Sequence, residues 1–203
     1  MDNKKINITV LVSGGGTNLQ ALIDAAEAGR LPGASINRII SSSHTAYALE
    51  RGKKHGIATC VVSGKDFPDE EKRNEKLLEE LRRADTDLIV LAGYMKVLSP
   101  VIIKAYEGRI VNIHPSLIPK YCGRGFYGIR VHEAVIAAGE KESGATVHFV
   151  DEGVDTGEII MQKKVPVLPG DTPESLAARV LETEHEILEA SVGRVVADLQ
   201  KRM

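Results

Sequence analysis

The stretch from residue 6 to residue 28, INITVLVSGGGTNLQALIDAAEA, decides the fold class. It opens with an apolar, β-branched run from Ile6 to Val12, which predicts a strand. Three glycines follow, and from about Asn18 to Ala28 the apolar residues recur at the spacing of one helix face. Gly29 suits the C-cap of that helix. A strand joined to a helix by a short glycine loop is the first unit of an α/β sheet.

The same alternation of strands and helices continues along all 203 residues. Further strands are predicted at residues 36–40, 58–62, 88–91, 109–113, 146–150 and 159–167. Helices are predicted at residues 46–55, 70–84, 100–106, 131–138 and 173–200. We therefore expect an open, mostly parallel, Rossmann-like sheet with right-handed crossovers and helices on both faces. Only the last two strands, joined by DEGVDTG, are too close for a crossover and should pair antiparallel. No repeat or linker interrupts the chain, so residues 1–203 are predicted to form one domain.

The composition excludes several classes of protein. A net charge of −2 argues against a nucleic-acid binder, which should carry a basic face. No run of 18 apolar residues or signal peptide is present, so no membrane partner is expected. Cys60 and Cys122 fit no metal or redox spacing and indicate free thiols in a cytoplasmic protein.

The glycine loop after the first strand is a candidate phosphate site. The amides of Gly16, Thr17 and Asn18 should lie at a helix N-terminus, where unpaired N–H groups and the helix dipole favour an anion. Leu19 stands where a dinucleotide motif needs its third glycine, and no Gly-Lys-Ser/Thr follows, so neither NAD nor ATP is indicated. A phosphomonoester fits better. The alternative is a tight turn in which Asn or Thr merely caps the helix.

A second candidate site lies in RIVNIHPSLIPKYCG, residues 109–123. Asn112 and His114 should share one face at the carboxyl end of a central strand, where open α/β sheets bind ligands. Asn can donate to an oxyanion and His can move protons near neutral pH. Asp155 also follows a predicted strand, so we expect it at the same sheet edge, raising the pKa of His114 and fixing its tautomer. The alternative is structural: a strand end and ordinary Asp-Thr-Gly turn chemistry.

The remaining histidines and serines suggest no other chemistry. His132 and His185 are each followed by Glu, but neither segment supplies the second His of a zinc helix, so no metal is expected. His148 alternates within a strand and is predicted to be structural. No Gly-x-Ser-x-Gly elbow is present, which disfavours a serine hydrolase.

Five stretches occur in one order and together resemble the phosphoribosylglycinamide formyltransferases of the folate-dependent formyltransferase superfamily. The most specific element is Asn-Ile-His-Pro-Ser-Leu, followed about forty residues later by Val-Asp-Thr-Gly. The glycine loop and VLETEH narrow the resemblance from the superfamily to its phosphoribosylglycinamide formyltransferases. The stretches are VSGGGTNLQALID, DLIVLAGYMKVLSP, RIVNIHPSLIPKY, GATVHFVDEGVDTGEIIMQKKVPV and AARVLETEH.

The resemblance implies an enzyme that transfers the formyl group of 10-formyltetrahydrofolate to the amine of 5′-phosphoribosylglycinamide, in de novo purine (IMP) biosynthesis. The folate is a cosubstrate; no tightly bound cofactor, metal or ATP is implied. By matching position the catalytic residues are Asn112, His114 and Asp155. Those for the nucleotide and its phosphate are Gly16, Thr17, Asn18, Gly93 and Glu184. Those for the folate are Met95, Lys96, Val97, Leu98, Asn112, Asp151, Val154 and Asp155. The resemblance also implies that the N-terminal half of the domain holds the nucleotide phosphate and the C-terminal half holds the folate.

The implied mechanism passes through a tetrahedral intermediate. Asn112 and a protonated His114 would donate to its oxyanion, and Asp155 would keep His114 charged. The expected partners are therefore small molecules, and the protein itself is expected to be a monomer or a homodimer.

Four features depart from the family pattern. Lys96 stands where some relatives carry Arg, Leu181 where some offer a polar group to the ribose, and Glu70 where some present Arg to the folate tail. The segment CGRGFYGIRVH, residues 122–132, is longer than in those relatives. It follows the candidate catalytic strand directly, and either a mobile lid or a surface insertion without a role would explain it.

Three other functions remain open at this point. A formyltetrahydrofolate hydrolase would use water in place of the amine, but its usual N-terminal regulatory domain has no room before Ile6. A methionyl-tRNA formyltransferase would need a further C-terminal domain and a basic surface. A non-catalytic phosphate-binding module would use only the glycine loop and leave His114 structural.

Overall fold

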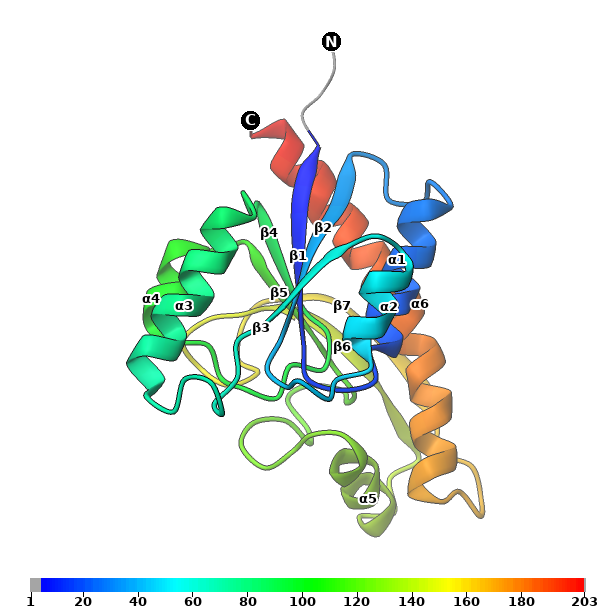
Figure 1. The fold of residues 1–203 in the computed structure, drawn as a ribbon. Helices are drawn as coiled ribbons and strands as arrows, with labels where there is room; N and C mark the ends of the chain where they lie inside the picture. Colours follow the sequence, from blue (N-terminus) through cyan, green and yellow to red (C-terminus); the bar gives the residue numbers. More distant parts are fainter. Residues whose placement is uncertain (1–4, 203) are drawn as a thin grey trace.

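The computed structural model describes residues 5–202 and is built on a seven-stranded sheet in the order β3-β2-β1-β4-β5-β6-β7 (Figure 1). The strands are β1 (Ile6–Val12), β2 (Ala34–Ser41), β3 (Ala58–Val61), β4 (Leu88–Leu91), β5 (Ile110–His114), β6 (Glu142–Phe149) and β7 (Ile159–Pro166). The helices are α1 (Thr17–Glu27), α2 (Ala48–Lys54), α3 (Glu70–Arg83), α4 (Pro100–Ala105), α5 (Ile129–Ala137) and α6 (Pro173–Lys201). The α/β class and these elements confirm the prediction, and the largest difference in a boundary is that β6 begins at Glu142 instead of Thr146.

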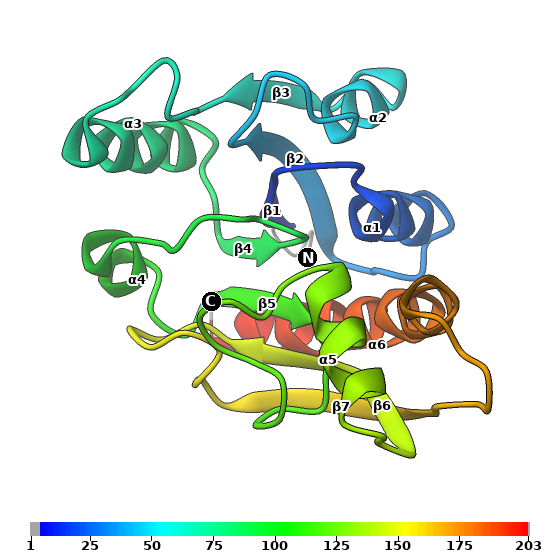
Figure 2. The same ribbon diagram turned by 90° about the horizontal axis from the view of Figure 1, so that it is seen from below.

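Helices cover both faces of the sheet, as predicted. Figure 2 shows α3 and α4 on one face and α1, α2 and α6 on the other. Each face has its own apolar cluster: one contains residues of α1 and α6, and the other contains residues of α3 and α4. Because β4 is buried along its whole length, its sequence LIVL is continuously apolar rather than alternating. Within residues 5–202 no helix is long and apolar enough to cross a membrane.

The sheet is parallel from β3 through β5 and antiparallel from β5 through β7. The β6–β7 pair was predicted, but the alternation of strand and helix also predicted a crossover between β5 and β6, and that is wrong. Helix α5 does not lie along the sheet between these strands. It lies beyond their end (Figure 1), so the chain re-enters the sheet from the end at which β5 leaves it. His114, the last residue of β5, is therefore paired with Thr146 of β6.

Side-chain caps explain where α3 and α6 begin. Asp69 caps α3 by accepting a hydrogen bond from the Lys72 N–H, and Thr172 forms a reciprocal capping box with Ser175 at the start of α6. Helix α1 differs, because its N-cap is Gly16 and no side chain caps it. The alternative in which Asn or Thr caps this helix is therefore wrong, and the first-turn amides of α1 have no side-chain partner among residues 5–202.

Candidate active site

The chain turns that follow β1, β4 and β5 lie at one edge of the sheet, because these strands are parallel and adjacent. Ser13 joins the first two turns: its Oγ accepts a hydrogen bond of 2.8 Å from the Met95 N–H and shares one of 2.6 Å with the Ser42 hydroxyl. The glycine loop and the GYMKVLSP segment, which are far apart in the sequence, are therefore in direct contact.

A cavity of about 370 Å³ opens at this edge. Its walls come from four segments, residues 91–98, 112–115, 123–128 and 148–155, together with Ile103. All the residues predicted to hold the folate line this one cavity: Met95, Lys96, Val97, Leu98, Asn112, Asp151, Val154 and Asp155. Gly93, which the resemblance assigned to the nucleotide, lines it as well.

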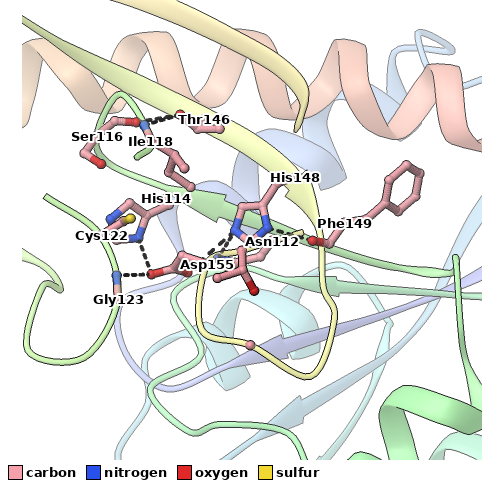
Figure 3. A network of polar contacts seen from close by, with 12 residues as sticks. Asn112, His114, Ser116, Ile118, Cys122, Gly123, Thr146, His148, Phe149 and Asp155 are labelled. Atoms are coloured by element: carbon pink, nitrogen blue, oxygen red, sulfur yellow. Dashed lines mark hydrogen bonds and ion pairs between the residues drawn. The ribbon is translucent and has the colours of Figure 1, made fainter. Parts of the chain in front are cut away.

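Asn112, His114 and Asp155 meet in the wall of the cavity, and His148 joins them (Figure 3). Asp155 lies between the two imidazoles, with Oδ2 3.6 Å from His114 Nδ1 and Oδ1 3.6 Å from His148 Nε2. The Gly123 N–H donates to Asp155 Oδ2 at 2.9 Å. The Asn112 amide donates to His148 Nε2 at 3.1 Å and approaches Asp155 Oδ1 only at 3.5 Å.

The partners of the two imidazoles assign their tautomers. His114 Nε2 lies 2.9 Å from the Tyr121 carbonyl oxygen, which can only accept, so Nε2 carries a proton and Nδ1 faces Asp155. His148 Nδ1 lies 2.7 Å from the Phe149 carbonyl oxygen, so its Nε2 is free to accept from Asn112. The free nitrogen of His114 is thus directed at a carboxylate, and that of His148 at an amide.

Burial dominates the titration of His114, whose residue is only 5% exposed. Burial lowers its pKa below 6.5, and the Tyr121 carbonyl and the Asp155 charge only partly compensate. Asp155 acts to raise the pKa of His114, as expected, but burial outweighs it, so the expectation that Asp155 keeps His114 charged is wrong. Burial acts to raise the pKa of Asp155, but His148, His114 and the Gly123 N–H together bring it below its usual value. The site thus favours a neutral imidazole beside a charged carboxylate.

Asp155 reaches His114 by a route that differs from the expected one. Because β6 is antiparallel to β5, Phe149 at its end lies level with Val111, away from the end of β5. The loop between β6 and β7 folds back to bring Asp155 to the cavity. Asp155 has a left-handed backbone with φ of 57°, and Tyr121, the other residue that contacts the His114 ring, has φ of 52°. Both are uncommon conformations for residues with a side chain, and such strain is typical of functional sites.

The Asp-Thr-Gly sequence fits this loop for packing reasons. The Thr156 hydroxyl donates to Asp151 Oδ1 at 2.6 Å, and the Gly153 N–H donates to the same oxygen at 3.0 Å. Gly157 lies against the Phe149 carbonyl, where a Cβ would collide with the backbone. The loop is therefore closed by contacts within itself, which fixes the position of Asp155.

The predicted phosphate residues form a separate group beside the cavity. Asn18 Nδ2 donates to Glu184 Oε2 at 2.6 Å, which joins the first turn of α1 to α6. Glu184 is 8% exposed, and burial raises its pKa while Asn18 acts in the opposite direction. The Asn18 Oδ1 is buried and has no hydrogen-bond partner among the described residues. Gly16, Thr17, Asn18 and Glu184 do not line the cavity.

Comparison with known proteins places these observations in a family. A family model described as formyl transferase matches residues 6–192. The chain belongs to the formyl transferase family. The phosphoribosylglycinamide formyltransferase of Escherichia coli (strain K12) is 41% identical over 182 residues, which cover 90% of this chain and 83% of that protein. The crystal structure of the phosphoribosylglycinamide formyltransferase from Brucella melitensis is similar with a TM-score of 0.87 and 43% identity, covering 96% of this chain and 97% of that one.

Another relative is much longer than this chain. The trifunctional purine biosynthetic protein adenosine-3 of Drosophila melanogaster is 46% identical over 186 residues. These residues are 91% of this chain but only 13% of that protein. The similarity to it therefore concerns one part of that protein.

The structure adds one residue that sequence reasoning missed. His148 was predicted to be structural, yet it contacts both Asn112 and Asp155. The signal that would have found it is cross-strand pairing, since Asn112 and His148 are direct partners in the β5–β6 register. That signal was hidden while β5 and β6 were expected to be parallel. Within residues 5–202 no group of three or more His, Cys, Asp or Glu side chains could hold a metal ion.

All four departures from the formyl transferase pattern lie in the part of the chain that the structure describes. Glu70 is the exposed first residue of α3 and does not line the cavity. Leu181 is half-buried on α6. Lys96 is exposed and lines the cavity. The fourth, residues 122–132, supplies six consecutive cavity residues, 123–128, and its last residue, His132, is buried on α5.

Proposed function

We propose that this protein transfers the formyl group of 10-formyltetrahydrofolate to the amine of 5′-phosphoribosylglycinamide, a step of de novo purine biosynthesis. The observation that carries the proposal is the meeting of Asn112, His114 and Asp155 in one cavity wall, next to an uncapped glycine loop. The names and high mutual coverage of the bacterial relatives support the same reaction.

The two substrates are assigned to neighbouring sites. The pterin end of the folate occupies the cavity, most of whose lining residues are apolar. The phosphate of the nucleotide binds the free amides at the start of α1, beyond Gly16. Glu184 lies beneath that turn through its bond with Asn18 and is assigned to the nucleotide. The contact between Ser13 and Met95 brings the two sites together, so the amine can reach the formyl carbon.

The reaction needs an oxyanion donor and a carrier for one proton. The amine nitrogen attacks the formyl carbon, and the carbonyl oxygen becomes an oxyanion. The Asn112 amide has two hydrogens. One is donated to His148 Nε2. The other is held only weakly, since Nδ2 lies 3.5 Å from Asp155 Oδ1, and it is donated to the oxyanion. This pairing keeps the carboxamide oriented before the substrates bind.

His114 moves the proton. It begins neutral, because burial lowers its pKa, and it accepts the amine proton on Nδ1, since Nε2–H is bonded to the Tyr121 carbonyl. Asp155 stabilises the resulting imidazolium. The proton then passes to the folate nitrogen as the bond between that nitrogen and the formyl carbon breaks. No ATP is consumed, because the formyl group is already activated.

The test is an assay of purified protein with 10-formyltetrahydrofolate, with and without the glycinamide nucleotide. We expect loss of the formyl donor only when the amine is present, and formylated nucleotide as the product. Loss of the donor without the amine would instead identify a hydrolase. His114→Ala should abolish transfer and leave binding of both substrates nearly unchanged; full turnover in that variant would contradict the role of His114. Binding of the nucleotide by the wild type without any transfer would favour a phosphate-binding module.

A further inference from the structure

Two exposed cations line the cavity. Lys96, from the turn after β4, and Arg124, from the segment after β5, are both exposed cavity residues. Neither makes a hydrogen bond or an ion pair with any residue in the range 5–202, whereas many other surface cations of this chain are paired. The two cavity carboxylates, Asp151 and Asp155, already accept hydrogen bonds. The charged side chains of the cavity that make no hydrogen bond or ion pair with residues 5–202 are therefore the two cations.

The backbone on both sides of Arg124 is held in place. On one side the Gly123 N–H donates to Asp155 Oδ2 at 2.9 Å. On the other side the Phe126 N–H donates to the Gly123 carbonyl at 3.2 Å, and the Phe126 ring packs edge-on against Tyr121 with 6.0 Å between centroids. The Arg124 side chain is thus unpaired, but its backbone is already ordered. Binding a ligand through Arg124 therefore loses less conformational entropy than binding through an Arg on an unanchored loop.

We propose that Arg124, together with Lys96, binds the carboxylates of the glutamate tail of the folate cosubstrate. This inference rests on the proposed function. The formyl-bearing nitrogen must lie at Asn112 and His114, so the tail extends from there along the cavity, and its carboxylates are the only anionic groups of the folate. A guanidinium donates two parallel hydrogen bonds to a carboxylate, which an ammonium cannot do. The segment 122–128 is then a specificity element for the length and charge of the tail.

The experiment compares formyl donors that differ only in the tail: 10-formyltetrahydropteroate, which has no glutamate, and 10-formyltetrahydrofolate with one or three glutamates. For Arg124→Gln we expect the KM for the glutamate-bearing donors to rise about three- to tenfold, as for loss of one partly exposed charged contact. We expect kcat within about twofold of the wild type and an unchanged KM for the pteroate donor. Arg124→Lys should recover part of the loss, and added salt should reduce the difference.

Arg130→Gln is the matched control, because Arg130 stacks on the Tyr127 ring at 4.9 Å and does not line the cavity. It removes the same charge from the same segment and should leave all three KM values unchanged. An equal rise in KM for the pteroate and glutamate donors in Arg124→Gln would mean a structural role and overturn the proposal. So would an unchanged KM for every donor.

Failure of the proposed function can be told apart from failure of this inference. If the wild type transfers no formyl group to the amine, the proposed function fails, and the tail contact is then measured by calorimetric binding of pteroate and pteroyltriglutamate. Tighter binding of the triglutamate that is lost in Arg124→Gln would support the tail contact. Equal binding of the two compounds by the wild type would refute it.

Discussion

At the scale of single residues, His114 shows how two opposing effects set a protonation state. The nearby Asp155 carboxylate favours the imidazolium, but burial disfavours it more strongly, so the pKa of His114 falls below 6.5. At neutral pH the residue can therefore accept a proton, and the proton it accepts is stabilised by the carboxylate 3.6 Å away. A buried base beside a carboxylate suits a residue that must take up and release one proton in each turnover.

This arrangement predicts the pH dependence of Asp155→Asn. In the wild type kcat/KM should fall as the pH drops through the pKa of His114, below 6.5, because the protonated ring cannot accept the amine proton. The substitution removes a charge that raises this pKa, so the acid limb should move to lower pH. The plateau should fall about 100-fold, because the imidazolium is no longer stabilised.

The measurement is kcat/KM from pH 5 to pH 9 for both proteins, with urea unfolding to confirm that the variant is folded. An acid limb that stays in place, or moves to higher pH, would show that Asp155 does not act on His114.

At the scale of elements, the start of α1 depends on one glycine. Gly16 has a left-handed backbone with φ of 73°, and a Cβ there would lie 2.6 Å from the Ala48 Cβ at the start of α2. The β1–α1 turn can therefore be tight only because this residue has no side chain. The same packing places the free amides of α1 at the edge of the sheet.

Gly16→Ala should accordingly destabilise the protein by about 2–4 kcal/mol, from the strained backbone and the collision with α2. Gly15→Ala is the matched control, since a Cβ at Gly15 meets nothing within 4 Å, and its cost should stay under about 1 kcal/mol. Urea unfolding of both variants measures the difference. Equal stability of the two variants would contradict this account of the turn.

The reversal between β5 and β6 is the second feature at this scale. Helix α5 lies beyond the end of the sheet and packs against α6 instead of acting as a crossover (Figures 1 and 2). The antiparallel register then places His148 directly opposite Asn112. The proposed catalytic residues and His148 consequently come from two neighbouring strands and a loop, and His148 gives Asn112 a fixed partner.

At the scale of the whole molecule, the stability should depend on a histidine outside the proposed catalytic group. His132 on α5 is buried, and its Nδ1 has no hydrogen-bond partner among the described residues. Burial, together with the charge of His114, lowers its pKa from 6.5 to about 4. The unfolded chain therefore binds a proton at His132 between these two pH values and the folded chain does not.

Stability should therefore fall as the pH drops from about 6.5 to about 4, and the contribution of His132 is roughly 3 kcal/mol. Below pH 4 this contribution stops growing, because both states are then protonated. His132→Leu should remove that part of the pH dependence while other groups keep theirs. The free energy of unfolding in urea, measured at several pH values for both proteins, tests this; parallel curves would exclude His132 as a source of acid sensitivity.

Short-range sequence patterns were sufficient to predict most of the fold and part of the candidate site. Apolar periodicity and glycine turns predicted the strands and helices to within a few residues, because these elements form from local backbone preferences and burial of one face. The Asn-x-His spacing predicted that Asn112 and His114 share a face, since side chains alternate along a strand. The place of Asp155 after a predicted strand suggested it as the partner of His114, although by a different route, and the resemblance supplied the residues of the cavity.

Only the tertiary structure decided what depends on residues distant in sequence. The antiparallel turn into β6, the role of His148 and the route of Asp155 follow from where α5 packs, and local preferences do not encode that. The direction of the His114 pKa also required the fold, because desolvation depends on every atom that surrounds the ring. Sequence thus determined which chemical groups are present and roughly where along the chain they lie, whereas packing decided their neighbours and their charge.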